Sequence, residues 1–342
     1  MSKNCYASVF CLCGLLFSAL LLANEWAGPK QAPPARSGMQ VSFIAADFRN
    51  GGVVGVYRSF ERAAKLLGWR VHAVDGRGDP AEIKRLAAEV LERKPDGLVL
   101  GGFGPESLGE LHELFQDRGI ALVGWHAGDR PGPTDKLFSN VTSDPLQVAD
   151  LATEYAMRDG PIGVVIFTDS QFAIATAKTQ RMVQRLEACT QCKVLSVEDL
   201  PIASAGKGMD ERVRSLQRRF GAEWSHTLAI NDVYFDHINV PLNALGRKDI
   251  RNISAGDGSA KALGRIHSGL SQQVATVAEP LSMQGWQLVD ELNRAFAGQS
   301  ASLFVTPPLL ITPQVLQESD DLTIELDFSH EDAYLRLWRQ VK

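Results

Sequence analysis

The chain has 342 residues, of which 45% are hydrophobic and 22% are charged, and its formal net charge is −5. This length and composition supply enough apolar material for two globular cores rather than one. The acidic balance argues against nucleic acid as a partner, because neutralising phosphates requires a basic face.

The N-terminal segment has the composition of an export signal. Lys3 gives a short positive start, an apolar stretch runs from Cys11 to Leu22, and Ala23 is a small residue suited to cleavage. We expect residues 1–23 to be a cleaved signal peptide and the mature protein to be periplasmic. The alternative is an uncleaved membrane anchor, which requires about 20 apolar residues, and this stretch is shorter.

Residues 24–38 are rich in Pro, Ala and Gly, which predicts a flexible leader. From residue 39 onward, apolar strand-like runs alternate with amphipathic helical segments, as in parallel sheets covered on both faces. In the first series we expect strands at 41–46, 70–75, 97–101 and 120–125, and helices at 53–67, 80–93 and 108–118.

A second series of the same kind starts near residue 144. We expect its helices at 148–158, 173–189, 209–220, 234–245 and 259–269, and its strands at 162–168, 194–200, 227–230, 250–255 and 274–278. A late helix at 283–297 and a strand at 307–311 are expected to return to the first lobe. The tail after residue 317 contains Tyr334 and Trp338 and is expected to pack against a lobe.

The predicted fold class is therefore α/β, with two similar doubly wound parallel-sheet lobes joined by a multi-strand hinge. The N-terminal lobe is expected to comprise residues 39–143 and 280–311. Residues 144–279 and 312–342 are expected to form the C-terminal lobe and tail.

Beyond the predicted signal, the only cysteines are Cys189 and Cys192. In an oxidising compartment this pair predicts a local disulfide where a helix turns into the next strand. A redox-active pair is the alternative, but the flanking sequence lacks the strand-to-helix context of such sites. Zinc would need two further ligands nearby, and none is suitably spaced, so we expect neither a metal nor a cofactor.

The common catalytic motifs are missing from the sequence. There is no Gly-x-Ser-x-Gly elbow, no Walker phosphate loop and no His-Glu-x-x-His segment. This pattern favours a binding protein over an enzyme.

Three motifs follow predicted strands late in the chain: Ala-Ile-Asn-Asp at 229–232, Ala-Gly-Asp-Gly at 255–258 and Ala-Thr-Val-Ala-Glu-Pro at 275–280. With the two-series plan and the export signal, they resemble the periplasmic binding proteins of the ribose and galactose type, over residues 39 to about 311. The resemblance implies capture of a small polar ligand, a sugar or sugar-like compound, by closure of two lobes.

The resemblance also implies a membrane partner, which is an ABC permease that receives the ligand. The alternative partner is a sensor kinase or chemoreceptor that recognises the closed form, and in either case we expect a monomer. A further alternative is an exported carbohydrate-acting enzyme with Asp257 or His126 as acid or base.

Open α/β sheets bind ligands beyond the carboxyl ends of their strands, and the resemblance places the candidate site there. In the second lobe, Asn231 and Asp257 would bond to ligand hydroxyls, with Glu279 beside a hinge crossing. The alternative for Asp257 is a turn or helix-cap role, and Glu279 would otherwise pair with a surface cation.

In the first lobe, Asp47, Phe48 and Asn50 occupy the first strand-to-helix loop, where the family often places an aromatic residue and an Asn against the ligand. Phe48 would alternatively be a buried loop residue.

Trp125 and His126 end the fourth strand, where many pentose and hexose binders have Asp-Arg. Core packing is the alternative role for Trp125. Phe172, and Thr176 or Lys178 at the start of the following helix, lie where relatives place another arginine. These departures favour a less hydroxylated or more aromatic ligand.

Overall fold

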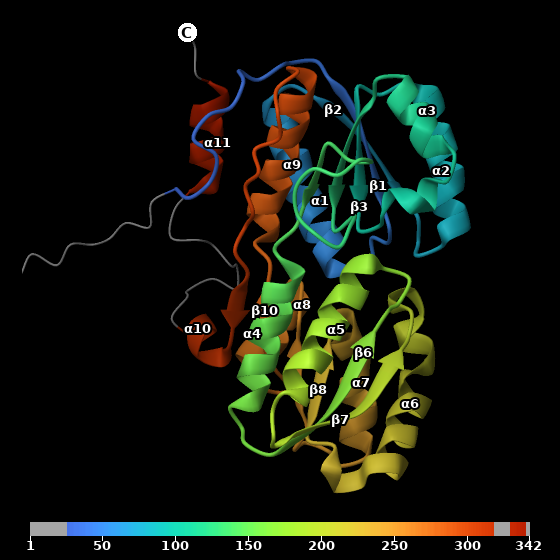
Figure 1. The fold of residues 1–342 in the computed structure, drawn as a ribbon, viewed down its shortest axis with the longest axis vertical. Helices are drawn as coiled ribbons and strands as arrows, with labels where there is room; N and C mark the ends of the chain where they lie inside the picture. The colour runs from blue at the N-terminus through green and yellow to red at the C-terminus, as the bar shows by residue number, and fades with distance from the viewer. Residues whose placement is uncertain (1–25, 318–328, 340–342) are drawn as a thin grey trace, which may run out of the picture.

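The computed structural model describes residues 26–317 and 329–339, which form two α/β lobes stacked along the long axis of the molecule (Figure 1). The predicted signal peptide lies outside the described residues. Within the described part, no helix combines the length and the apolar character that a membrane crossing requires.

The first lobe contains a parallel sheet in the order β2-β1-β3-β4-β5. Its strands are β1 (Gln40–Ala45), β2 (Arg70–Asp75), β3 (Gly97–Gly101), β4 (Ala121–Trp125) and β5 (Ser139–Val141). The connecting helices are α1 (Gly51–Leu66), α2 (Pro80–Arg93), the 3-10 turn η1 (Pro105–Leu108) and α3 (Leu111–Asp117).

Alternating side chains of β1 explain why helices cover both faces of this sheet. Phe43 packs in a cluster with residues of α1, whereas its neighbour Ile44 packs with residues of α2 and α3. Successive side chains of a strand point to opposite faces, so a strand with apolar side chains on both faces needs cover on both.

The second lobe contains a sheet in the order β11-β10-β9-β8-β6-β7, in which only β11 is antiparallel to its neighbour. Its strands are β6 (Ile162–Thr168), β7 (Cys192–Asp199), β8 (His226–Ala229), β9 (Arg251–Ser254), β10 (Gln273–Ala278) and β11 (Leu309–Ile311). Its helical segments are α4 (Pro145–Met157), α5 (Ala173–Glu187), η2 (Ile202–Ser204), α6 (Ala205–Phe220), η3 (Gly221–Glu223), α7 (Val233–Ala244), α8 (Ala260–Ser268) and α10 (Pro313–Gln317).

Helix α9 (Leu281–Phe296) returns from the second lobe to the first and packs along α1 (Figure 1). Close packing is possible because Gly285 faces α1: a methyl group at this position would lie 2.6 Å from the backbone nitrogen of Phe60. The chain then goes back to the second lobe as β11, so it crosses between the lobes after β5, after β10 and after α9. Three crossings restrict relative motion of the lobes to hinge bending.

The predicted fold class is confirmed, and two assignments of the chain ends are wrong. Residues 309–311 pair with β10 in the second lobe rather than in the first, because Ile311 completes an apolar cluster with α8. In the tail, α10 stays with the second lobe, but α11 (His330–Trp338) packs on α9 in the first. The stacked rings of Trp286 and Trp338, 5.5 Å apart, hold it there.

The predicted flexible leader is docked over its described part, residues 26–38. Asn293 on α9 donates to the carbonyl of Pro33 at 3.0 Å, and the amide of Ala35 donates to the carbonyl of Trp338. Trp26 packs edge-on against Tyr334 with ring centroids 5.0 Å apart. A proline-rich composition predicts flexibility only where no neighbouring groups bind the backbone carbonyls.

Replacing Trp338 tests the packing of α11. The side chain is fully buried, and its indole N–H donates to the buried carboxylate of Asp290 at 2.8 Å. Trp338→Ala should lower the free energy of unfolding by about 3–5 kcal/mol through the cavity and the lost bond. Urea denaturation measures this, with the exposed Arg336→Ala on the same helix as the control. Equal midpoints for the two variants would contradict the packing role.

Candidate ligand-binding cleft

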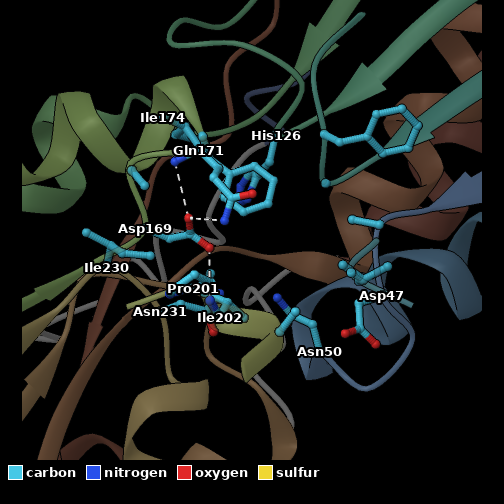
Figure 2. A pocket seen from close by; sticks show the side chains of 18 of the residues that line it. Asp47, Asn50, His126, Asp169, Gln171, Ile174, Pro201, Ile202, Ile230 and Asn231 are labelled. Carbon is cyan, nitrogen blue, oxygen red and sulfur yellow. Dashed lines mark hydrogen bonds between the residues drawn. The ribbon is translucent and has the colours of Figure 1, made fainter. Parts of the chain in front are cut away.

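A cleft lies between the lobes, where the carboxyl ends of the two sets of parallel strands face each other (Figure 2). The first lobe lines it with Ala46, Asp47, Asn50, Val53, Gly78, Pro80, Ile83, Gly102, Phe103, Ser107, Trp125 and His126. The second lobe lines it with Asp169, Gln171, Phe172, Ile174, Ala175, Lys178, Pro201, Ile202, Ala203, Ile230, Asn231 and Asp257.

Most of the predicted site residues stand in this wall: Asp47, Asn50, Trp125, His126, Phe172, Asn231 and Asp257. The others do not. Phe48 packs on Phe43 and Tyr57, with centroids 6.4 and 5.1 Å away, because its ring completes an aromatic cluster of the first lobe. Thr176 lies in the first turn of α5 and Glu279 lies behind the wall, so neither lines the cleft.

The lobes touch at both sides of the cleft. At the hinge side, Gly52 in the first turn of α1 lies against Asp257: a methyl group at Gly52 would be 2.3 Å from the carboxylate oxygen Oδ2. At the other side, a methyl group at Gly78 would be 2.3 Å from the Cβ of Ala203. Glycine at these two positions therefore permits the close approach of the lobes.

The loop that carries Asp257 is held by Asp232, which is fully buried. One oxygen of Asp232 accepts the backbone N–H groups of Asp257, Gly258 and Ser259 at 2.9–3.1 Å. The other oxygen accepts from Gln273 and Thr276 on β10. Asp232 is thus a positioning residue, because it fixes the direction from which Asp257 enters the cleft.

Burial raises the pKa of Asp257 to about 6, although the positive charges of His126 and Lys178 act to lower it. Asn231 donates to the Oδ2 atom of Asp257 at 2.6 Å, and the amide oxygen of Asn231 caps α7 at Val233. No bond to the Oδ1 atom of Asp257 is found among the described residues, so this oxygen is available to a ligand.

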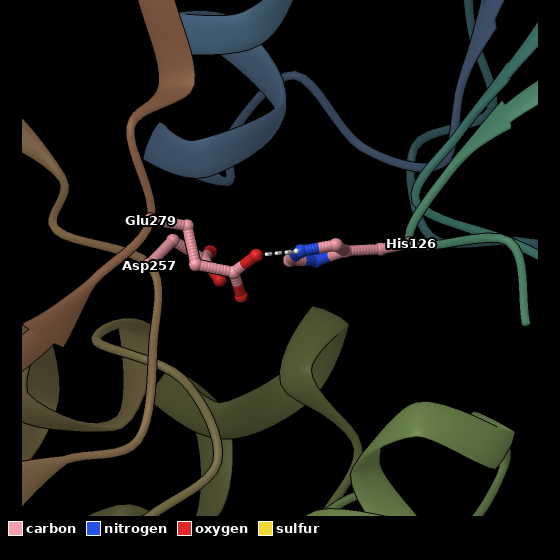
Figure 3. Close-up of side chains that lie close together, drawn as sticks. All are labelled: His126, Asp257 and Glu279. Carbon is pink, nitrogen blue, oxygen red and sulfur yellow. Dashed lines mark hydrogen bonds and ion pairs between the residues drawn. The ribbon is translucent and has the colours of Figure 1, made fainter. Parts of the chain in front are cut away.

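Glu279 is the centre of what we call the hinge network: Glu279, His126, Ser143, Lys178, Gln284 and Thr306. His126 of the first lobe reaches Glu279 at 2.9 Å (Figure 3), and the Ser143 amide donates to the same oxygen at 3.0 Å. Lys178 of the second lobe lies 3.4 Å from the other oxygen. Burial alone would raise the pKa of Glu279, but the charges of His126 and Lys178 outweigh it and hold that pKa well below its ordinary value.

Gln284 joins the three chain crossings within this network. Its amide nitrogen donates to Thr306 at 2.8 Å and lies 3.2 Å from Glu279 and 3.4 Å from the Ser143 hydroxyl. Its amide oxygen accepts from the indole of Trp125 at 2.7 Å. Trp125 therefore both lines the cleft and, through its bond to Gln284, supports the hinge.

The ligating atoms of His126, Asp257 and Glu279 lie within 4.8 Å of one another, as in a metal site (Figure 3). However, the Lys178 ammonium is already beside Glu279 and also donates to the carbonyl of Ala255 at 2.9 Å. His126 and Lys178 thus already contact the two carboxylate oxygens of Glu279. The arrangement therefore fits a buried ion-pair network better than a metal centre.

Lys178 lines the cleft, whereas Thr176, the other candidate at the start of α5, does not. The two residues are two positions apart, so they lie on different faces of the helix. Other lining residues were not among the predicted site residues. Asp169 accepts from the backbone of Ile202 and from Gln171 (Figure 2), and no pattern in the sequence indicates this contact.

The structure contains a disulfide between Cys189 and Cys192, between the end of α5 and the start of β7. No lining residue contacts it through a bond found in the described chain.

The raised pKa of Asp257 predicts a pH-dependent stability. Because its pKa is about 6 in the folded protein and 3.8 ordinarily, its protonated form stabilises the fold fully below about pH 4, and this contribution is lost as the pH rises through 6. Asp257→Asn should therefore gain stability over the wild type between pH 4 and 7, by on the order of 2–3 kcal/mol. Urea denaturation across this range measures the difference, with the exposed Asp129→Asn as control. A difference that does not change with pH would refute the assignment.

Comparison with known proteins agrees with this architecture. A family model described as "Periplasmic binding protein domain" matches residues 41–300. No curated protein matches the chain significantly.

Many solved structures share the fold. A 5-methylthioribose transporter solute binding protein from Thermotoga lettingae, in complex with 5-methylthioribose, has a TM-score of 0.74 at 16% identity, covering 92% of this chain and 95% of that chain. An ABC transporter solute binding protein from Agrobacterium vitis with bound allitol has a TM-score of 0.71 at 19% identity, covering 82% and 98%. An ABC sugar transporter subunit from Rhodobacter sphaeroides has a TM-score of 0.70 at 22% identity, covering 81% and 99%.

At these identities, the structural likeness shows the fold alone, whereas the family model spans most of the chain. The chain belongs to the family of periplasmic binding protein domains.

Proposed function

We propose that this protein binds a small polar ligand, a sugar or a sugar-like compound, by closing its two lobes, and that the closed form delivers the ligand to an ABC permease. The observation that carries the proposal is a cleft whose polar side chains come from both lobes: Asn50 and His126 from the first, Lys178, Asn231 and Asp257 from the second. A ligand that bonds to both sets favours the closed form over the open one.

The free hydrogen-bonding capacity of these residues supports a polyol ligand. The side-chain oxygen of Asn50 caps α1 at Gly52, which leaves its NH₂ group for a ligand. Asp257 offers an acceptor, and Lys178 has a third hydrogen beyond those directed at Ala255 and Glu279. Donors and acceptors are thus both present, as hydroxyl groups require.

The fold relatives support the same class of ligand. The solved structures with this fold include proteins with bound allitol, myo-inositol, glycerol and 5-methylthioribose. We therefore propose that this chain also binds a polyol-like ligand. We further propose that it is a monomer and that a signal at residues 1–23 exports it to the periplasm.

A receptor protein that recognises the closed form, such as a sensor kinase or chemoreceptor, is the alternative destination of the complex. An enzyme is a second candidate, because the raised pKa of Asp257 beside His126 would suit an acid–base pair. Mass spectrometry of small molecules released from the denatured protein distinguishes a binding protein from an enzyme. A binding protein returns its ligand unchanged, whereas conversion of an added polyol would contradict the proposal.

Closure itself is tested at Gly52. Gly52→Ala should leave both lobes folded but obstruct the closed form, because the methyl group would lie 2.3 Å from Asp257. We expect it to weaken polyol binding at least tenfold, the equivalent of about 1.4 kcal/mol. The measurement is the rise in melting temperature with allitol, myo-inositol or 5-methylthioribose.

Gly264→Ala on α8 is the matched control, because a methyl group there has no neighbour within 4 Å. It should respond to the polyols as the wild type does. Equal responses from the Gly52 and Gly264 variants would show that closure does not need this contact.

A further inference from the structure

The cleft has two ends of different chemistry. Its hinge end contains Asn50, His126, Lys178, Asn231 and Asp257. Away from the hinge lies a surface that we call the apolar wall, formed by Ile83, Phe103, Phe172 and Ile202.

The apolar wall is continuous across the two lobes. Ile83 and Phe103 belong to one apolar cluster of the first lobe, and Phe172 of the second lobe packs against that same cluster. Phe172 and Ile202 also pack against the core of the second lobe. Phe172 therefore joins the apolar surfaces of both lobes where they meet.

Two carboxylates near the apolar wall, those of Asp169 and Asp47, are already bonded within the protein. The Asp169 carboxylate accepts from the amide of Ile202 at 2.9 Å and from Gln171 at 3.2 and 3.3 Å. The Asp47 carboxylate is bound by Arg49, with contacts of 2.6–3.1 Å. These carboxylates have little remaining capacity for ligand hydroxyls, in contrast to the groups at the hinge end.

A ligand that carries hydroxyls along its whole length would fit this cleft poorly. A hydroxyl buried against the apolar wall without a partner would weaken binding by roughly fivefold to a hundredfold. A methyl-sized group buried there would instead strengthen binding by about fourfold. The walls thus select for a molecule with one polar and one apolar end.

Resting on the proposed function, we propose that the ligand is a polyol or sugar that carries an apolar substituent. Its hydroxyls bind at the hinge end, to Asn50, Lys178 and Asp257, and its substituent lies on the apolar wall. No arginine lines the cleft in the described part of the chain, which favours an uncharged substituent over a phosphate or carboxylate.

The test compares matched pairs of compounds by isothermal titration calorimetry. Free pentoses, hexoses and inositols are paired with their O-methyl and S-methyl derivatives, among them ribose with 5-methylthioribose. Within the pair that binds most tightly, we expect the methylated compound to have an affinity at least about fourfold higher than that of the free sugar. Equal or tighter binding of the free sugars would overturn this inference and leave the proposed function standing, whereas no binding in either series would overturn both.

The apolar wall is tested by Ile202→Asn, which changes a half-buried residue of a short 3-10 turn. This variant should weaken the binding of the methylated compound more than that of the free sugar. The ratio of the two affinities should fall at least threefold. Val197→Asn, on an exposed position of β7 outside the cleft, is the control and should leave the preference unchanged. An unchanged preference in the Ile202 variant would place the substituent elsewhere and overturn the proposal.

Discussion

The buried carboxylate of Glu279 is the group on which the arrangement of the two lobes depends. It stands where the chain leaves β10, and it bonds to His126 of the first lobe, to the Ser143 backbone at another crossing and to Lys178 of the second lobe. A buried carboxylate without partners would cost several kcal/mol, so the fold keeps these cationic and amide groups around it. The hinge network therefore joins the hinge, both lobes and the floor of the cleft in one set of contacts.

This arrangement connects ligand binding with the relative position of the lobes. Lys178 and His126 both line the cleft and both contact the carboxylate of Glu279 behind it. Asp257 of the second lobe lies against Gly52 of the first. A ligand that binds to these side chains therefore acts on groups that already hold the lobes together. Such a ligand shifts the populations of the open and closed forms only as far as its affinities for the two forms differ.

The sequence predicts the layers of the fold because buried parallel strands are continuous apolar runs, such as Ile162–Thr168, whose predicted and observed bounds coincide. It misses β5, which has three residues and is too short to show a period. At the site, strand ends predict Asn231 and Asp257, because these positions follow from topology. The Gly52 contact and the separation of polar and apolar ends depend on how the lobes meet, and no local pattern encodes that.

The most direct test of the central claim is the distance between the lobes in solution. Spin labels at Arg77→Cys and Lys207→Cys, both exposed and on opposite lobes, report this distance by double electron–electron resonance. We expect one population at a longer and one at a shorter distance between the labels. The polyol that binds most tightly should empty the population at the longer distance. A single distance distribution that the bound polyol leaves unchanged would contradict this expectation.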